Sequence, residues 1–261
     1  MVLTYSFCNV SVMPLRSEPS HGAEQMSQLL FGERATVLEV NNKDWARIAC
    51  EWDGYEGWCR FSQLAVVTAK EYRKTAKYFS TGNAGKLVFE NSEMWLPAGS
   101  ELVRLKKGFI TPVNKAGKFK GKKGVVKNVS LNGAAVKDAA MQYLHAPYQW
   151  GGRSIAGIDC SGLTQMVFKL CNKSIPRDAS QQANEGTLVD FLQHANCGDL
   201  AFFDNAEGKI VHVAILLDGQ TVIHATETAG RVVLDHIDPA GIISNTLKKR
   251  THNLRFVKRI M

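Results

Sequence analysis

The sequence predicts two small β-barrels followed by a larger α+β domain. Over residues 5–67 and again over 69–129, apolar runs of strand length are interrupted by glycine, aspartate, asparagine or proline roughly every ten residues, as in short antiparallel strands. After Leu131, two helical segments come first and strand-like segments follow in quick succession, which is the order of an α+β domain. We therefore expect three domains, over residues 1–68, 69–130 and 131–261.

The first two domains are expected to consist of short strands. Alternating residues mark strands in TVLEV and ARIAC, a tight turn is expected at DGYEGW, and CRFSQLAVV then forms the next strand. From residue 69 a connector leads to the runs KLVF, GSELVRL and GVVKNV. Glycines are too frequent in this second part for a helix.

The third domain is expected to pack helices on an antiparallel sheet. The apolar spacing of LNGAAVKDAAMQYLHA predicts a helix of about three turns, and SGLTQMVFKLCN predicts a second helix. The strands are expected in LAFF, IVHVAILL, TVIHAT, RVVLDH and LRFVKRI.

The composition is that of a globular protein. Of 261 residues, 45% are hydrophobic and 21% are charged, which excludes collagen-like, coiled-coil and wholly disordered chains. No apolar run approaches the roughly 18 residues that a membrane span needs. No basic start followed by an apolar block marks an export signal. We expect a monomer in the cytoplasm, or in the periplasm if a signal peptide has been removed.

The net charge of +8 favours anionic partners. Its excess is concentrated between Arg104 and Lys127, a segment without any acidic residue. This basic run contains Lys106, Lys107, Lys115, Lys118, Lys120, Lys122 and Lys123. Because no nucleic-acid motif accompanies it, we expect no nucleic-acid partner. We interpret the run as a solvated hairpin surface, with anion docking as the alternative.

The cysteines are expected to be reduced. The six cysteines include no CxxC pair and no repeated zinc-ribbon spacing. If one thiol is the nucleophile, five cysteines remain, and pairing them in disulfides would leave one cysteine unpaired. Only Cys50 and Cys59 could lie on facing hairpin strands.

Cys160 is the candidate nucleophile. A glycine-rich loop over residues 148–158 precedes Asp159-Cys160-Ser161, and an amphipathic helix follows. The unpaired N–H groups and the dipole of a helix N-terminus favour a thiolate and can receive an oxyanion. The alternative is an ordinary buried cysteine.

Two histidines are candidates for the base. His212 and His224 each lie in an apolar strand-like run, and Asp218-Gly219-Gln220 between them predicts a hairpin turn. On adjacent strands, one imidazole could accept the Cys160 proton while the other orients it. The alternatives are core histidines, or a zinc site formed with Cys160 and Cys197, whose ligand spacing is wrong for the common structural sites. We expect no metal and no cofactor.

Several separated motifs occur in an order that points to one family. They are Tyr148, Trp150-Gly151-Gly152, Asp159-Cys160-Ser161-Gly162, Gly198-Asp199-Leu200 with Phe203, His212 and Ile223-His224-Ala225. This set resembles the NlpC family of papain-like cysteine peptidases, which cut bacterial cell-wall peptides. The two N-terminal barrels resemble bacterial SH3-like domains. The three-part layout is similar to γ-D-glutamyl-L-diamino acid endopeptidases of murein peptide recycling.

The resemblance implies roles for the matching residues. Cys160 would be the nucleophile and His212 the general base, with His224 orienting it. The Tyr148 hydroxyl and the Cys160 backbone N–H would hold the oxyanion.

The resemblance also implies a pocket for the substrate's N-terminal end. Its expected residues are Asp159, Ser161, Asp178 and Trp150, joined by Tyr55 and Glu24 of the first barrel, with Glu24 preferred over Glu18. As alternatives, Ser161 and Asp178 could be helix caps, and Trp150 could pack in the core. Ile158 and Ala179 depart from residues that are common in relatives.

The implied function is hydrolysis of the γ-D-glutamyl-diamino acid bond in a murein tripeptide or tetrapeptide with a free N-terminal L-Ala. Three alternatives remain: acyl transfer to a nucleophile other than water, a broader endopeptidase acting on intact murein, and a non-catalytic cell-wall peptide-binding module. The presence of Cys160, His212 and His224 together argues against the last.

Overall fold

The computed structural model describes residues 2–110, 116–126 and 129–261. The chain divides into two compact units, Met1–Val129 and Ser130–Met261. The second unit begins one residue before the domain start expected at residue 131. The further division of the first unit into two domains at residues 68 and 69 stays a prediction.

The larger sheet of the first unit has seven antiparallel strands in the order β3-β2-β6-β5-β4-β1-β7. Its strands are β1 (Thr4–Cys8), β2 (Val12–Arg16), β3 (Gln25–Leu30), β4 (Arg34–Val40), β5 (Trp45–Cys50), β6 (Glu56–Arg60) and β7 (Leu64–Val67). The prediction of one strand in CRFSQLAVV is wrong. A 3-10 turn over Phe61–Gln63 separates β6 from β7, because β6 pairs with β5 while β7 pairs with β1.

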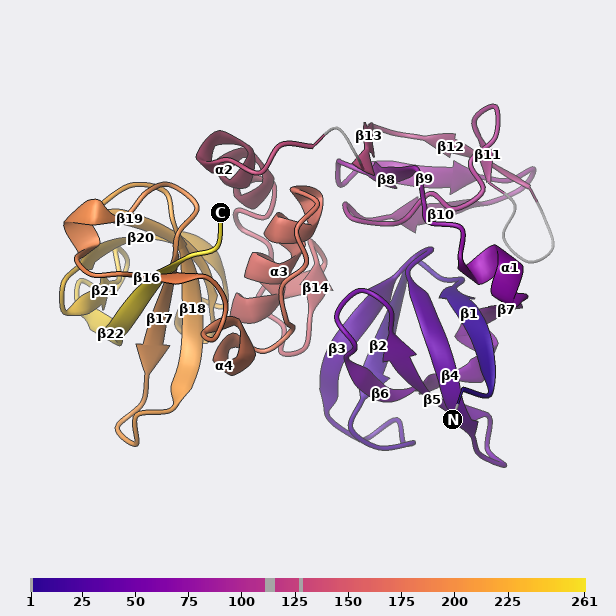
Figure 1. The fold of residues 1–261 in the computed structure, drawn as a ribbon, viewed down its shortest axis with the longest axis horizontal. Coiled ribbons are helices and arrows are strands. Elements are labelled where there is room, and N and C mark those ends of the chain that lie inside the picture. Colours follow the sequence, from indigo (N-terminus) through magenta and orange to yellow (C-terminus); the bar gives the residue numbers. More distant parts are fainter. Residues whose placement is uncertain (1, 111–115, 127–128) are drawn as a thin grey trace. The chain divides into compact units, whose positions relative to one another are not determined.

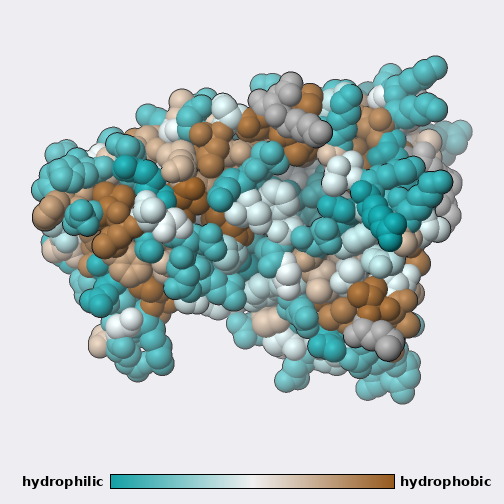
Figure 2. All heavy atoms as spheres, viewed as in Figure 1, coloured by the Kyte–Doolittle hydropathy of each residue, from teal (hydrophilic) through white to brown (hydrophobic). Residues whose placement is uncertain are grey.

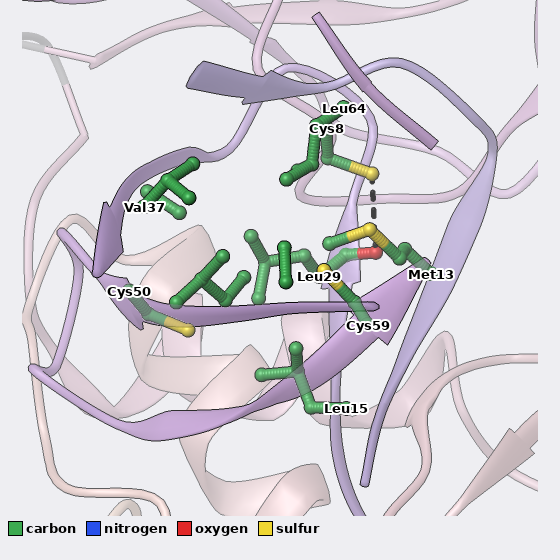
Figure 3. Close-up of a cluster of buried hydrophobic side chains, with 11 residues drawn as sticks. Cys8, Met13, Leu15, Leu29, Val37, Cys50, Cys59 and Leu64 are labelled. Atoms are coloured by element: carbon green, nitrogen blue, oxygen red, sulfur yellow. Dashed lines mark hydrogen bonds between the residues drawn. The ribbon is translucent and has the colours of Figure 1, made fainter. Parts of the chain in front are cut away.

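Three cysteines of the first unit lie in the hydrophobic core of this sheet (Figure 3). Cys8, Cys50 and Cys59 pack among leucine, valine and methionine side chains, and Cys8 Sγ donates a hydrogen bond to the Leu29 carbonyl over 3.6 Å. Burial raises the pKa of the Cys59 thiol to about 12. Cys59 pairs with Ala46 rather than with Cys50, and all six cysteines are free thiols. Buried thiols of this kind behave as small apolar residues.

The rest of the first unit contains two smaller sheets. Four strands follow the order β10-β9-β12-β11, and β13 pairs with β8. The elements are α1 (Ala69–Tyr72), β8 (Tyr78–Ser80), β9 (Gly85–Val88), β10 (Glu93–Leu96), β11 (Phe109–Ile110), β12 (Gly117–Lys120) and β13 (Lys123–Val125). Lys118, Lys120, Lys122 and Lys123 of the basic run are exposed on β12, on β13 or between them, whereas Lys115 and Lys127 lie outside the described residues. The expected hairpin is wrong for this stretch, because β12 pairs with β9 and β11 while β13 pairs with β8.

The second unit contains a closed antiparallel barrel with helices beside it (Figure 1). Closure follows because β21 pairs with both β20 and β22, and β16 extends the sheet at β22. The helices are α2 (Gly133–Met141), α3 (Cys160–Leu170) and α4 (Ala179–Gln182). The strands are β14 (Arg153–Ser154), β15 (Gly157–Ile158), β16 (Thr187–Val189), β17 (Leu200–Asp204), β18 (Ile210–Leu216), β19 (Thr221–Thr226), β20 (Arg231–Asp238), β21 (Gly241–Ile243) and β22 (Arg250–Arg259).

The α+β prediction for the second unit is right in part. Both expected helices form, and α3 packs on β18 and β19 of an antiparallel sheet. However, the described residues contain only four α-helices in all, and the sheet is a closed barrel rather than an open layer. The strand that closes it, β21, has only three residues, GII, and carries too little pattern to be predicted.

The surface agrees with the globular composition. On the face seen in Figure 1, Figure 2 shows mostly hydrophilic side chains, with hydrophobic residues in separate patches. Among the described residues, no helix is both long and apolar enough to cross a membrane.

Candidate active site

Cys160 is the first residue of α3, as the sequence predicted. Asp159 is the N-cap, and its Oδ1 accepts a hydrogen bond from the Gly162 backbone N–H over 2.6 Å. The 148–158 loop packs tightly against this first turn, because a Cβ on Gly162 would lie 2.2 Å from the Gly152 carbonyl oxygen. Only glycine at position 162 allows this approach.

A buried ion pair holds the loop and the helix start together. Arg177 donates to Asp159 Oδ2 over 2.6 Å and to Ser161 Oγ over 2.8 Å, and Gly151 N–H donates to the same Asp159 oxygen over 2.7 Å. The Arg177 and Asp159 side chains are 2% and 6% exposed. Sequence analysis missed Arg177; the only signal was an arginine beside Asp178 in IPRDAS.

The Cys160 thiol is not ionised by its helix alone. Burial raises its pKa to about 12 and the Asp159 carboxylate raises it further, while hydrogen bonds from the backbone N–H groups of Val213 and Ser161 lower it. The N–H groups at the helix start favour the thiolate, as predicted, but the cost of desolvating the charged form exceeds this gain. A base must therefore take the proton.

His212 and His224 lie on adjacent antiparallel strands, β18 and β19, as predicted. His212 Nε2 and His224 Nδ1 are 2.9 Å apart, and both side chains are buried. Since the N–H of Val213 bonds to the Cys160 sulfur, the thiol lies against β18 beside His212. Burial lowers the pKa of His212 well below its usual range, and His252 and His224 lower it further. His212 is therefore neutral near pH 7 and can accept a proton.

Two further residues of this cluster were missed by sequence analysis. His252 of β22 stacks on His212, with ring centroids 4.1 Å apart and planes 21° apart. The Asp235 carboxylate of β20 lies 3.1 Å from His224 Nε2. The only sequence signals were a carboxylate inside the apolar run RVVLDH and a histidine inside THNLRF.

The histidine cluster does not have the geometry of a metal site. Ring nitrogens of His212, His224 and His252 lie within 4.8 Å of one another. However, the first two are already hydrogen-bonded to each other, and stacked rings direct their lone pairs in parallel rather than toward one ion. Cys197, the fourth ligand of the zinc alternative, instead donates to the Gly133 carbonyl over 3.2 Å. That no metal is needed stays a prediction.

Tyr148 lies close to the thiol. Its side chain is half-buried, and burial together with the nearby Cys160 and Asp159 raises the pKa of its phenol. The hydroxyl therefore stays protonated and can donate a hydrogen bond, as an oxyanion-binding group must.

The residues expected to line the pocket in the second unit differ in exposure and in hydrogen bonding. Trp150 is 60% exposed, so the core-packing alternative for it is wrong. Asp178 is the N-cap of α4 but makes no side-chain cap bond, and Ser161 accepts from Arg177. Contact of these residues or of Asp159 with substrate stays a prediction.

Tyr55 and Glu24 belong to the first unit. Tyr55 is half-buried against the hydrophobic core of the seven-stranded sheet, so its aromatic ring has a structural role as well. Glu24 is exposed just before β3. Their contact with substrate stays a prediction.

The comparisons with known proteins give the family. Residues 145–251 match the model of the NlpC/P60 family, and residues 15–64 match that of the bacterial dipeptidyl-peptidase Sh3 domain. A relative from Bacillus subtilis, named gamma-D-glutamyl-L-lysine dipeptidyl-peptidase, is 30% identical over 220 residues, covering 77% of this chain and 72% of the relative. The chain belongs to the NlpC/P60 family. It is a cysteine peptidase with an SH3-like N-terminal domain.

Two further proteins are similar along most of the chain. Dipeptidyl-peptidase 6 from Lysinibacillus sphaericus is 25% identical over 251 residues, covering 86% of this chain and 88% of the relative. A crystal structure of an NlpC/P60 family protein from Bacillus cereus superposes with a TM-score of 0.83 at 21% identity, covering 98% and 99% of the two chains. This likeness shows the shared fold.

The buried histidines predict a loss of stability in mild acid. The folded pKa of His252 is lowered to about 4, mainly by burial, from 6.5. The unfolded chain therefore binds a proton that the folded chain resists, and stability is lost as pH falls below about 6.5. For His252 alone the loss at pH 5 is about 2 kcal/mol. Urea unfolding at pH 7.5 and pH 5 measures it, and His252→Phe should remove about this share. If the unmodified protein and His252→Phe lost the same stability between pH 7.5 and pH 5, His252 would not be the cause of the loss.

Proposed function

We propose that this peptidase hydrolyses the γ-D-glutamyl-diamino acid bond of murein peptides that begin with a free L-Ala, in cell-wall peptide recycling. The observation that carries the proposal is the hydrogen-bonded His212–His224 pair beside Cys160. It occurs in a chain that is similar, over 77% of its length, to a protein named gamma-D-glutamyl-L-lysine dipeptidyl-peptidase.

The reaction follows from the protonation states of the resting site. His212 accepts the Cys160 proton as the sulfur attacks the γ-carbonyl of D-Glu, and Tyr148 with the Cys160 N–H stabilises the oxyanion. His212 then gives the proton to the leaving amine, so the diamino acid departs and a thioester remains. Water, deprotonated by His212, attacks the thioester and releases L-Ala-γ-D-Glu with the free thiol.

Recognition of the free amine is proposed to depend on carboxylates. A buried ammonium needs hydrogen-bond acceptors and opposite charge to offset its desolvation. Asp159, Ser161 and Asp178, with Trp150 as a wall, are proposed to surround the L-Ala end. Tyr55 and Glu24 of the SH3-like domain are proposed to complete this site and to restrict it to short peptides.

The substrate is proposed to be a murein tripeptide or tetrapeptide, met by a monomer in the cytoplasm. The net charge of +8 favours such a ligand, which carries several carboxylates.

The test compares two peptides that differ only at the amine. L-Ala-γ-D-Glu-diaminopimelate and its N-acetylated form are incubated with the protein, and products are identified by mass spectrometry. We expect L-Ala-γ-D-Glu from the free peptide and at least about a hundred-fold slower cleavage of the acetylated one, because a buried acceptor set left unpaired is costly. The lysine tripeptide in parallel gives the diamino acid preference.

Substitutions in the first unit test the source of this selectivity. Tyr55→Phe keeps the packing of the ring, and Glu24→Gln removes one charge. Both substitutions should raise KM for the free-amine peptide. They should also reduce the ratio of its cleavage rate to that of the N-acetylated peptide. Glu18→Gln is the matched control, because Glu18 is also an exposed glutamate and also precedes β3 in the sequence. Equal cleavage of both peptides by the unmodified enzyme would favour a broader murein endopeptidase, and cleavage of neither would favour acyl transfer or peptide binding.

A further inference from the structure

We propose that Asp235 is a positioning residue that fixes the tautomers of His224 and His212, so that Nδ1 of His212 is the nitrogen that takes the Cys160 proton. The inference rests on the proposed function only in taking Cys160 and His212 as nucleophile and base. It does not depend on which peptide is cleaved.

Asp235 is built into the barrel beside the histidines. It lies on β20, where residue 235 pairs with Val222 of β19 and Val233 pairs with His224. Asp235 and His224 are thus diagonal neighbours on one face of the sheet. The Asp235 side chain is 4% exposed and that of His224 is 1% exposed, so solvent does not compete for their hydrogen bonds.

Both Asp235 oxygens have defined partners. Oδ2 lies 3.1 Å from His224 Nε2, and Oδ1 accepts the backbone N–H of Asn245 over 2.8 Å. Burial alone would raise the pKa of Asp235, but these hydrogen bonds and the neighbouring histidines bring it below its usual value. An ionised carboxylate only accepts hydrogen bonds, so the proton between the two groups belongs to His224 Nε2.

The remaining protons follow in sequence. When neutral His224 carries its proton on Nε2, its Nδ1 is an acceptor. The 2.9 Å contact then requires His212 to donate from Nε2. Neutral His212 consequently has an unprotonated Nδ1, the one ring nitrogen left for the thiol. The sequence of hydrogen bonds from Asp235 thus selects the tautomer that can act as a base.

The same arrangement stabilises the charged state that forms during attack. One proton moves from Cys160 Sγ to His212 Nδ1, and no other bond in the row breaks. The resulting imidazolium keeps its Nε2–H bond to His224, which remains polarised by the Asp235 carboxylate. The Asp235 carboxylate is separated from the imidazolium by one imidazole and from the thiolate by two, so it supports the cation with less repulsion of the anion.

Asp235→Asn is a sharp test because the site forces the amide orientation. The Asn245 N–H still requires an acceptor, so the amide oxygen must take the place of Oδ1. The amide NH2 group then faces His224 Nε2 and donates to it. His224 must carry its proton on Nδ1, His212 must accept at Nε2, and the His212 proton moves to Nδ1, where it blocks the base.

Two readouts are needed, and neither requires a peptide substrate. Nitrogen-15 NMR of the histidine rings at pH 8, above the ordinary histidine pKa of about 6.5, reports each tautomer directly. The alkylation rate of Cys160 by iodoacetamide, followed by peptide mapping, reports deprotonation of the thiol. We expect Asp235→Asn to reverse both tautomers and to slow alkylation about a hundred-fold or more, the usual contribution of a general base.

Asp238→Asn is the matched control. It makes the same chemical change three residues further along β20, at a carboxylate that pairs with Arg250 over 2.7 Å. We expect unchanged tautomers and an alkylation rate within about twofold of the unmodified protein, as for a surface pair.

Each outcome separates this inference from the proposed function. Unchanged tautomers and alkylation in folded Asp235→Asn would overturn the role of Asp235, whatever the substrate. If that variant does not fold, the NMR spectrum of the unmodified protein decides: a proton on His212 Nδ1 at pH 8 overturns the inference. The expected tautomers and alkylation without any cleavage of the tripeptide would support Asp235 and contradict the proposed substrate.

Discussion

Cys160→Ala is expected to abolish hydrolysis while leaving peptide binding intact. The side chain supplies the only atom that becomes covalently bound to substrate, and alanine cannot form the thioester. We expect kcat to fall by about 10⁴-fold or more, as when the nucleophile of a triad is removed. Calorimetry should still detect binding of the tripeptide, since the oxyanion-binding and pocket groups remain.

Cys171→Ala is the matched control for this substitution. Cys171 is a buried free thiol at the other end of α3, so the two variants lose the same atom from the same helix. We expect Cys171→Ala to keep the unmodified kcat with a modest loss of stability. If Cys160→Ala turned over substrate near the rate of the unmodified protein, Cys160 could not be the nucleophile.

Arg177→Met is expected to cause the largest loss of stability. It leaves the Asp159 carboxylate buried without its cation, which costs about 3 kcal/mol or more. For a unit of this size that lowers Tm by about 10 °C. Because the same carboxylate caps α3 and holds the Gly151 N–H, we also expect kcat to fall as the loop bearing Tyr148 loses its support.

Arg250→Met controls for loss of an arginine ion pair as such. Arg250 pairs with Asp238 through two hydrogen bonds but is partly exposed, so water can replace the arginine. We expect a loss of less than about 1 kcal/mol. Equal losses in the two variants, measured by urea unfolding, would show that burial of the Arg177–Asp159 pair carries no special weight.

The strands and helices that bear chemistry could be predicted from the sequence. Periodicity placed a helix start at Cys160, and two apolar runs joined by a turn placed His212 and His224 on adjacent strands. Those are local patterns, and local patterns are what a single sequence records well.

The partners that depend on sheet register could not be predicted. Asp235 meets His224 through the register of β20 against β19, and His252 stacks on His212 from β22, which lies far along the chain from β18. Arg177 meets Asp159 across 18 residues of chain. Charged and aromatic residues in such positions look like ordinary surface residues until the tertiary pairing is known.

The protonation states of Cys160 and His212 also could not be predicted from the sequence. A helix N-terminus argued for a Cys160 thiolate, yet burial raises the pKa of that thiol to about 12 and lowers that of His212. The resting pair is therefore a neutral thiol and a neutral imidazole. The depth of burial that decides this balance is a property of the packed unit and not of the local motif.

The most direct measurement is rapid-quench mass spectrometry of the intact protein with L-Ala-γ-D-Glu-diaminopimelate. We predict a transient covalent adduct with the mass of the L-Ala-γ-D-Glu acyl group, mapped by proteolysis to Cys160, with free diaminopimelate released in the same interval. Release of diaminopimelate together with an adduct on another residue would contradict Cys160 as the nucleophile, and absence of any cleavage of this peptide would contradict the proposed substrate.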